Sequence, residues 1–120
     1  MEKLLKIAAE VSKELVKRQE TISVIESSSG GLISSSLLSQ AGASAYYIGG
    51  QVVYTARSIK GVTGFRLRDL KEKNIRSSSE PFALFLGKKG VEMYSTDWCV
   101  TETGAAGPSG NGYGDPAGYS

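Results

Sequence analysis

Apolar and polar positions alternate along the chain with a period that changes from helical to extended. Over residues 2–18, charged side chains separate apolar ones that recur every three or four positions: Leu4, Ile7, Ala8, Val11, Leu15 and Val16. This spacing predicts an amphipathic helix. Residues 21–26, TISVIE, are instead rich in β-branched side chains over a length that is typical of a strand.

The same reasoning predicts the elements that follow the small-residue turn SSSGG. We expect a helix, a strand, a short basic helix, a longer helix and a third strand, over residues 32–38, 48–56, 66–73, 77–97 and 98–103. The longer helix begins with a serine cap and has glutamate and proline in its first turn, as helix starts commonly do. We expect Leu84, Phe85 and Val91 of this helix to face the core.

Helices and strands in this order predict an α/β domain, with a mixed or parallel sheet and helices packed on it. All three strands lead into polar or glycine-rich segments: SSSGG, TARSIK and TGAAGPSG. In such sheets ligands bind beyond the carboxyl ends of the strands. The pattern therefore predicts a small-molecule site where these three segments meet.

The composition is that of a single globular domain. The chain has 120 residues, 40% of them hydrophobic, and a net charge of +2, so we treat residues 1–120 as one domain. The small charge excess argues against nucleic-acid binding, and no stretch approaches membrane-spanning length. We expect the one cysteine, Cys99, to be a buried packing residue. Together these features favour a cytoplasmic protein that binds neither nucleic acid nor membrane.

The chain contains no histidine. A Ser-His-Asp triad, a Cys-His pair and a His-ligated metal are therefore excluded within it. If the protein is an enzyme, its base must be a lysine, a carboxylate, a tyrosine or a water molecule.

Three features could carry chemistry, and each has a structural alternative. The SSSGG turn could cradle a phosphate with its backbone N–H groups, or it could be a tight turn with a serine cap. A serine could act as a nucleophile with Lys60 as its base and Tyr54 as a proton relay, although most loop serines form caps and turns. Glu26, at the end of a strand, could act as a base or contact a ribose hydroxyl, or it could bond to the backbone of its own turn.

Four motifs, in their order along the chain, resemble those of the CinA C-terminal domain family, the nicotinamide-nucleotide amidohydrolases. ESSSGG is similar to the family's ESCTGG, and GASAYYIGGQVVYT to its G-S-S-A-(aromatic)-(aromatic)-x-x-G-x-V-x-Y-(Ser/Thr) segment. SSSEP resembles the family's V-S-E-P helix start, and TGAAGPSGNGYGDPAGY resembles its T-G-I-A-G-P loop. The resemblance covers nearly the whole chain.

The resemblance implies an α/β domain that hydrolyses the amide of nicotinamide mononucleotide to nicotinic acid mononucleotide and ammonia, with no metal or organic cofactor. Carried over by position, Ser44 in GASA would be the nucleophile, Tyr54 the assisting tyrosine and Lys60 the base. The residues that would line the nucleotide site are Glu26, Ser27, Ser29, Gly30, Gly31, Thr103, Gly104 and Gly107. We further expect the protein to form a homo-oligomer.

Three departures from the family pattern leave a second interpretation open. Ser28 stands where the family has a cysteine that we do not regard as catalytic. The family's lysine position holds Ile59, and Lys60 follows one residue later, which turns a helical side chain by about 100°. Family domains also continue past the last loop, so we expect residues 1–120 to be incomplete at the C-terminus. The chain could therefore be a catalytically silent nucleotide-binding or oligomer-forming module of the same fold.

Overall fold

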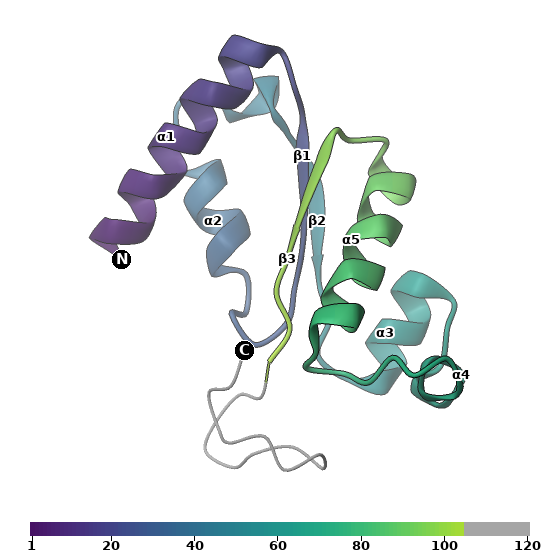
Figure 1. The fold of residues 1–120 in the computed structure, drawn as a ribbon. Coiled ribbons are helices and arrows are strands. Elements are labelled where there is room, and N and C mark those ends of the chain that lie inside the picture. The colour runs from purple at the N-terminus through teal and green to yellow at the C-terminus, as the bar shows by residue number, and fades with distance from the viewer. Residues whose placement is uncertain (105–120) are drawn as a thin grey trace.

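The computed structural model describes residues 1–104 of the chain. Its helices and strands follow one another as shown in Figure 1: α1 (Glu2–Arg18), β1 (Ile22–Glu26), α2 (Leu32–Leu38), the short 3-10 helix η1 (Ala43–Ala45), β2 (Tyr47–Val52), α3 (Ala56–Thr63), α4 (Leu67–Glu72), α5 (Glu80–Tyr94) and β3 (Trp98–Thr101). The α/β class that the sequence predicts is confirmed. None of the helices in this part of the chain is long and apolar enough to cross a membrane.

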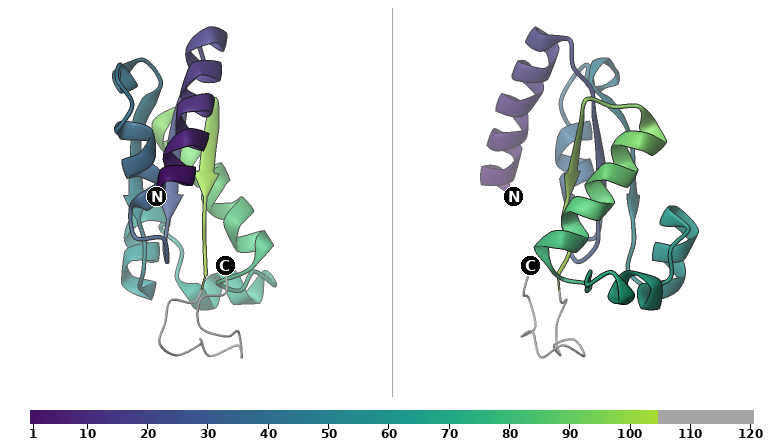
Figure 2. Two further views of the ribbon diagram at one scale, coloured as in Figure 1. Left: turned by 90° about the vertical axis from the view of Figure 1, so that its left-hand side faces the viewer. Right: turned by 45° about the vertical axis from the view of Figure 1, so that its right-hand side comes forward.

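The three strands form a parallel sheet in the order β2-β1-β3. Parallel neighbours need crossover connections, and helices supply them here. Helices α1 and α2 lie on one side of the sheet and α5 on the other, while α3 and α4 lie near the end at which the strands finish (Figures 1 and 2). Both faces therefore carry helices, which is the usual arrangement of a parallel sheet.

The central strand, β1, is buried on both of its faces. All of its residues, from Ile22 to Glu26, are buried, which explains why apolar side chains, those of Ile22, Val24 and Ile25, point to both faces of the sheet instead of to one. Side chains that alternate along β1 enter two core clusters, one on each side of the sheet. The first cluster comprises Ala8, Leu15, Ile22, Val24, Leu37 and Tyr46, and the second comprises Ile25, Val53, Ile59, Leu70, Phe82 and Leu86.

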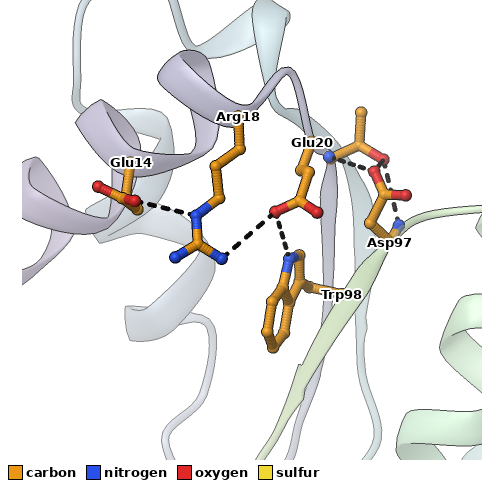
Figure 3. Close-up of polar contacts among 6 residues, drawn as sticks. Glu14, Arg18, Glu20, Asp97 and Trp98 are labelled. Carbon is orange, nitrogen blue, oxygen red and sulfur yellow. Dashed lines mark hydrogen bonds and ion pairs between the residues drawn. The ribbon is translucent and has the colours of Figure 1, made fainter.

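Polar contacts join the end of α1 to the starts of β1 and β3 (Figure 3). The Arg18 guanidinium lies 3.8 Å from a carboxylate oxygen of Glu20, and the indole N–H of Trp98 donates to Glu20 at 3.1 Å. The backbone N–H of Thr21 donates to the Asp97 carboxylate at 2.8 Å. These contacts hold the amino edge of the sheet, opposite the carboxyl edge at which parallel α/β sheets usually bind ligands.

The second strand differs from the prediction. The strand expected over residues 48–56 ends at Val52, and α3, which the sequence analysis did not predict, begins at Ala56. Thr55 caps this helix: its hydroxyl accepts the N–H of Ser58, and the Ser58 hydroxyl accepts the N–H of Thr55. This reciprocal capping box starts a helix almost directly after the strand.

The side of α5 that faces the core also differs from the prediction. The buried residues of α5 are spaced four positions apart: Phe82, Leu86 and Gly90. Leu84 and Val91, which we expected in the core, are 68% and 36% exposed, whereas Phe85 does pack against the second cluster. Gly90 allows the close approach of α5 to β3, because a Cβ there would lie 2.3 Å from Sγ of Cys99.

Cys99 is partly exposed, although we expected it to be buried. It extends from β3 toward α5, against Gly90. Burial raises the pKa of the thiol above its usual value, so the side chain is a protonated packing residue at neutral pH.

Candidate functional site

The residues that directly follow the three strands, as far as Gly104 after β3, lie at the carboxyl edge of the sheet, as predicted; the rest of TGAAGPSG lies outside the described residues. The N–H of Val53, directly after β2, donates to the carbonyl of Glu26, the last residue of β1, at 2.8 Å. The N–H of Glu102, directly after β3, donates to the carbonyl of Ile25 at 3.1 Å. The turn at residues 27–30 follows the central strand and therefore lies between the other two segments.

Glu26 is fully buried and caps the start of α2. Its Oε1 accepts the hydroxyl of Ser29 at 2.7 Å and the N–H of Ile33 at 3.1 Å, and its Oε2 accepts the N–H of Ser34 at 3.0 Å. The side chain is 0% exposed. The structure therefore favours the structural role that we considered for Glu26 over a direct contact with a ribose hydroxyl.

A second carboxylate, that of Glu102, holds the same turn from the side of β3. Its Oε1 accepts the N–H groups of Ser27 and Ser29, at 2.9 and 3.0 Å, and lies 2.8 Å from the Ser29 hydroxyl, whose one hydrogen is shared between Glu26 and Glu102. Its Oε2 accepts the hydroxyl of Ser28. One carboxylate thus ties the turn to α2, and the other ties it to β3.

Hydrogen bonds keep both carboxyl groups ionised at neutral pH. Burial raises the pKa of Glu26, but the bonds from Ser29, Ser34 and Ile33 outweigh it and hold the pKa below the usual value of 4.5. Burial also raises the pKa of Glu102, and the bonds from residues 27–29 again bring it below 4.5. Among the residues that the structure describes, no three Cys, Asp or Glu side chains are grouped as metal ligands would be.

Most N–H and hydroxyl groups of the turn already donate hydrogen bonds within the chain. The N–H groups of Ser27 and Ser29 donate to Glu102, and that of Gly30 donates to the Ser27 carbonyl at 3.0 Å. A phosphate cradle made of these N–H groups, one of our hypotheses, is therefore filled by the chain's own carboxylate. The hydroxyls of Ser28 and Ser29 also donate to carboxylates. Within residues 1–104 the hydroxyl of Ser27 has no hydrogen-bond partner, and it reaches the surface.

Gly30 and Gly31 complete the turn in a backbone conformation that favours glycine. Their φ angles are +66° and +104°, in the region that side chains with a Cβ rarely adopt. The two glycines turn the chain from β1 into α2. This conformational role accounts for the GG of the motif, and their predicted contact with a nucleotide stays a prediction.

The structure does not bring the three predicted catalytic residues together. Ser44 lies in η1, which precedes β2, and is therefore at the amino edge of the sheet. Tyr54 and Lys60 follow β2 at the carboxyl edge, and both are exposed. Within one chain the structure therefore does not place Ser44 beside Lys60, because the whole length of β2 separates the two residues.

Lys60 lies one residue after the family's lysine position, and its side chain points in a different direction from that of the residue at that position. Ile59, at the family's lysine position, is 6% exposed and lies in the second core cluster. Lys60, one residue later on α3, is exposed to solvent. The helix therefore does not compensate for the displacement.

The segment after β3 forms the other side of the edge. Thr103 is buried, and its hydroxyl accepts the N–H of Ser78 at 3.2 Å. Gly104 ends the described part of the chain, and Gly107 lies outside it. A cavity of about 360 Å³ adjoins this segment and the start of α5, and is lined by Ser78, Ser79, Glu80, Ala83, Thr101, Glu102 and Thr103.

Sequence reasoning missed Glu102. The available signal was a charged residue directly after an uncharged strand, in WCVTETG. Its importance depends on the neighbouring turn, which lies far away in the sequence.

Comparison with known proteins identifies the family. The sequence model of the family described as CinA C-terminal domain matches residues 4–120. The chain belongs to the CinA C-terminal domain family. The resemblance that we found from four motifs is thereby confirmed.

Relatives named CinA-like protein include one from Prochlorococcus marinus, 34% identical over 104 residues, and one from Thermotoga sp., 36% identical over 110 residues. The matches cover 87% and 91% of this chain but 24% and 26% of the relatives. The chain thus spans about a quarter of the length of these CinA-like proteins.

Solved structures of the family share the fold. Competence damage-inducible protein A from Klebsiella pneumoniae has a TM-score of 0.86 at 27% identity, and competence/damage inducible protein CihA from Agrobacterium tumefaciens has a TM-score of 0.84 at 27% identity. Each match covers 96% of this chain, and 70% and 68% of the solved chains respectively. The predicted CinA-like architecture is confirmed.

Proposed function

We propose that the chain is a CinA-type amidohydrolase that converts nicotinamide mononucleotide to nicotinic acid mononucleotide and ammonia at the carboxyl edge of its sheet. The position of Ser27 carries the proposal. It directly follows the central strand, and its hydroxyl is the one in the SSSGG turn that donates to no carboxylate. Parallel α/β sheets bind their ligands at this edge, and family membership supports the substrate class.

In the proposed reaction, the Ser27 hydroxyl oxygen attacks the carboxamide carbon, and its proton passes to a base. The carbon–nitrogen bond then breaks, and ammonia leaves with that proton. Water hydrolyses the acyl-serine, which releases the carboxylate product and restores the hydroxyl. Ser27 replaces Ser44 as the nucleophile because it lies at the same edge as the other candidate groups.

Lys60 and Tyr54 keep the roles of base and proton relay in this proposal. Both follow β2, the neighbour of β1 in the sheet, so they lie at the same edge as Ser27. A lysine acts as a base when desolvation lowers its pKa. The bound nucleotide must therefore cover the exposed Lys60 side chain, and catalytic contacts often tighten in this way when substrate binds.

Two observations favour a second function, that of a silent nucleotide-binding module. Within the described range, the Lys60 ammonium bonds to no serine, and Ile59 occupies the core at the family's lysine position. A chain that retained the fold without a base would bind the nucleotide and leave it unchanged.

Ammonia release from nicotinamide mononucleotide distinguishes the two functions. We expect the unmodified chain to release ammonia, and Lys60→Ala to be at least about 100-fold slower, the usual size of a general-base contribution. Lys88→Ala is the matched control, since Lys88 is an exposed lysine on α5. Binding of the nucleotide in calorimetry without ammonia release would instead support the silent module.

The proposal includes self-association and a cytoplasmic location. Apolar side chains of α1 and β3 are partly exposed around one cavity, with Val11 at 36%, Trp98 at 50% and Val100 at 38%. A second copy of the chain would remove such a surface from water. Light scattering of the purified chain tests the self-association, and a mass that stays that of the monomer at all concentrations would contradict it.

A further inference from the structure

Glu102, directly after β3, binds the turn after β1 through hydrogen bonds. Its side chain crosses from the end of β3 and meets residues that lie 73 to 75 positions earlier in the chain. It accepts the backbone N–H groups of Ser27 and Ser29 and the hydroxyl of Ser28, and it shares the single hydroxyl hydrogen of Ser29 with Glu26. Such charge-assisted bonds are about twice as strong as neutral ones, so this carboxylate is a main anchor of the turn.

The bonds to Glu102 define the backbone on both sides of Ser28. One oxygen, Oε1, receives the N–H of Ser27 at 2.9 Å and that of Ser29 at 3.0 Å. The Ser27 carbonyl is held as well, because it accepts the N–H of Gly30 at 3.0 Å. With its amide and its carbonyl both bonded, Ser27 has a defined backbone direction, and its Cα–Cβ bond is aimed accordingly.

The same contacts distinguish the three serine hydroxyls of the turn from one another. Those of Ser28 and Ser29 donate to carboxylates, while that of Ser27 stays available for a ligand. We infer that Glu102 is a positioning residue, which holds the Ser27–Ser29 turn so that Ser27 alone presents its hydroxyl to the substrate. This inference rests on the proposed role of Ser27 as the nucleophile.

Glu102 is better suited to position the turn than to accept a proton. A carboxylate that receives several hydrogen bonds is a weak base, and burial and hydrogen bonding together leave the pKa of Glu102 below its usual value. The alternative, in which Glu102 removes the proton of Ser28 as a general base, makes a different prediction for a neutral substitute of the same shape.

Glu102→Gln and Glu102→Ala separate the two roles. In the glutamine variant the amide oxygen can accept both N–H groups, and the NH₂ can donate to the Ser28 hydroxyl, which also accepts. We expect Glu102→Gln to keep kcat for ammonia release within about fivefold, because the turn keeps its geometry, and Glu102→Ala to lose about 100-fold in kcat, the scale of a 1 Å misplacement. KM should change much less than kcat. Glu72→Ala, an exposed acid on α4, is the control.

A general base would show a different pattern. If Glu102 were one, Glu102→Gln would lose as much activity as Glu102→Ala, and the acid limb of the pH profile would vanish in both variants. That result would overturn the positioning role. Equal activity of the unmodified chain and Glu102→Ala would overturn it as well.

Amide hydrogen exchange tests the same inference without turnover. We expect the N–H groups of Ser27 and Ser29 to exchange at least about tenfold faster in Glu102→Ala than in the unmodified chain, since their acceptor is lost, and to be unaffected in Glu72→Ala. Unchanged exchange would contradict the inference even if activity fell. If the unmodified chain releases no ammonia, the proposed function fails, and faster exchange still supports the hold of Glu102 on the turn.

Discussion

Ser44 and Lys60 lie beyond opposite ends of the same strand. Ser44 precedes Tyr47, where β2 begins, and Lys60 follows Val52, where it ends. A strand advances about 3.3 Å per residue, so β2 alone places roughly 16 Å between the two residues. Motif position thus suggested a nucleophile at the amino edge of the sheet. The topology instead puts Ser27 at the edge that Lys60 shares.

Glu26→Gln is expected to destabilise the fold more than Glu102→Gln does. Each oxygen of Glu26 accepts a backbone N–H, from Ile33 and from Ser34, so an amide NH₂ in either place would face another donor. At Glu102 the corresponding oxygen accepts the hydroxyl of Ser28, which can reverse its role. We expect Glu26→Gln to lower the free energy of unfolding by about 1–3 kcal/mol, as measured by urea denaturation at pH 7. Equal losses for the two variants would contradict these hydrogen bonds.

Acid should weaken the unmodified chain more steeply than Glu102→Gln. The pKa of Glu102 is lower in the folded protein than its usual value of 4.5. Such a group stabilises the fold above its unfolded pKa, and this contribution is lost as the pH falls through its folded pKa. We therefore expect the free energy of unfolding of the two proteins to converge as the pH is lowered below about 4.5, near the unfolded pKa of a glutamate. Parallel curves over that range would show that the carboxylate charge contributes nothing.

Two glycines inside helices are expected to respond in opposite ways to alanine. A Cβ on Gly61 of α3 would meet nothing within 4 Å, whereas one on Gly90 of α5 would lie 2.3 Å from Sγ of Cys99 and 3.2 Å from Cδ1 of Ile25. Alanine is favoured over glycine in a helix by about 1 kcal/mol, so Gly61→Ala should raise the melting temperature. Gly90→Ala should lower the free energy of unfolding by about 1–3 kcal/mol through overpacking.

The contact with Cys99 can be tested directly. Adding Cys99→Ala to Gly90→Ala removes the sulfur and should recover part of the lost stability in thermal unfolding, while Cys99→Ala added to Gly61→Ala should not help. A stabilising effect of Gly90→Ala alone would contradict the close approach of α5 to β3.

The fold was predicted best where local signals and burial agree. Residues 22–26 are all buried because the sheet is covered on both sides, and the β-branched residues Ile22, Val24 and Ile25 fit such a strand. The start of α5 has local signals too: the Ser79 hydroxyl accepts the N–H of Phe82 at 3.3 Å, and Pro81 lies in the first turn. The meeting of three loops at one edge followed from the parallel topology alone.

The remaining features depend on contacts between distant segments. The core-facing side of α5 is decided by Gly90 against Cys99, and α3 begins with a capping box in which Ser58 replaces the usual Glu or Gln. Glu102 acts on Ser29, 73 residues earlier. A motif match identifies residues one by one, but it does not say at which edge of the sheet each one lies, and that is why Ser44 was paired with Lys60 although β2 lies between them.

Comparison of Ser27→Ala with Ser44→Ala tests the location of the reaction most directly. Each variant removes one serine hydroxyl, and the two serines lie at opposite edges of the sheet. Ammonia release from nicotinamide mononucleotide is measured for both variants and for the unmodified chain. We predict that Ser27→Ala, with its fold intact, loses at least about 100-fold in kcat, as the loss of a nucleophile does, and that Ser44→Ala retains nearly full activity. An inactive Ser44→Ala beside an active Ser27→Ala would contradict the placement of the reaction at the carboxyl edge.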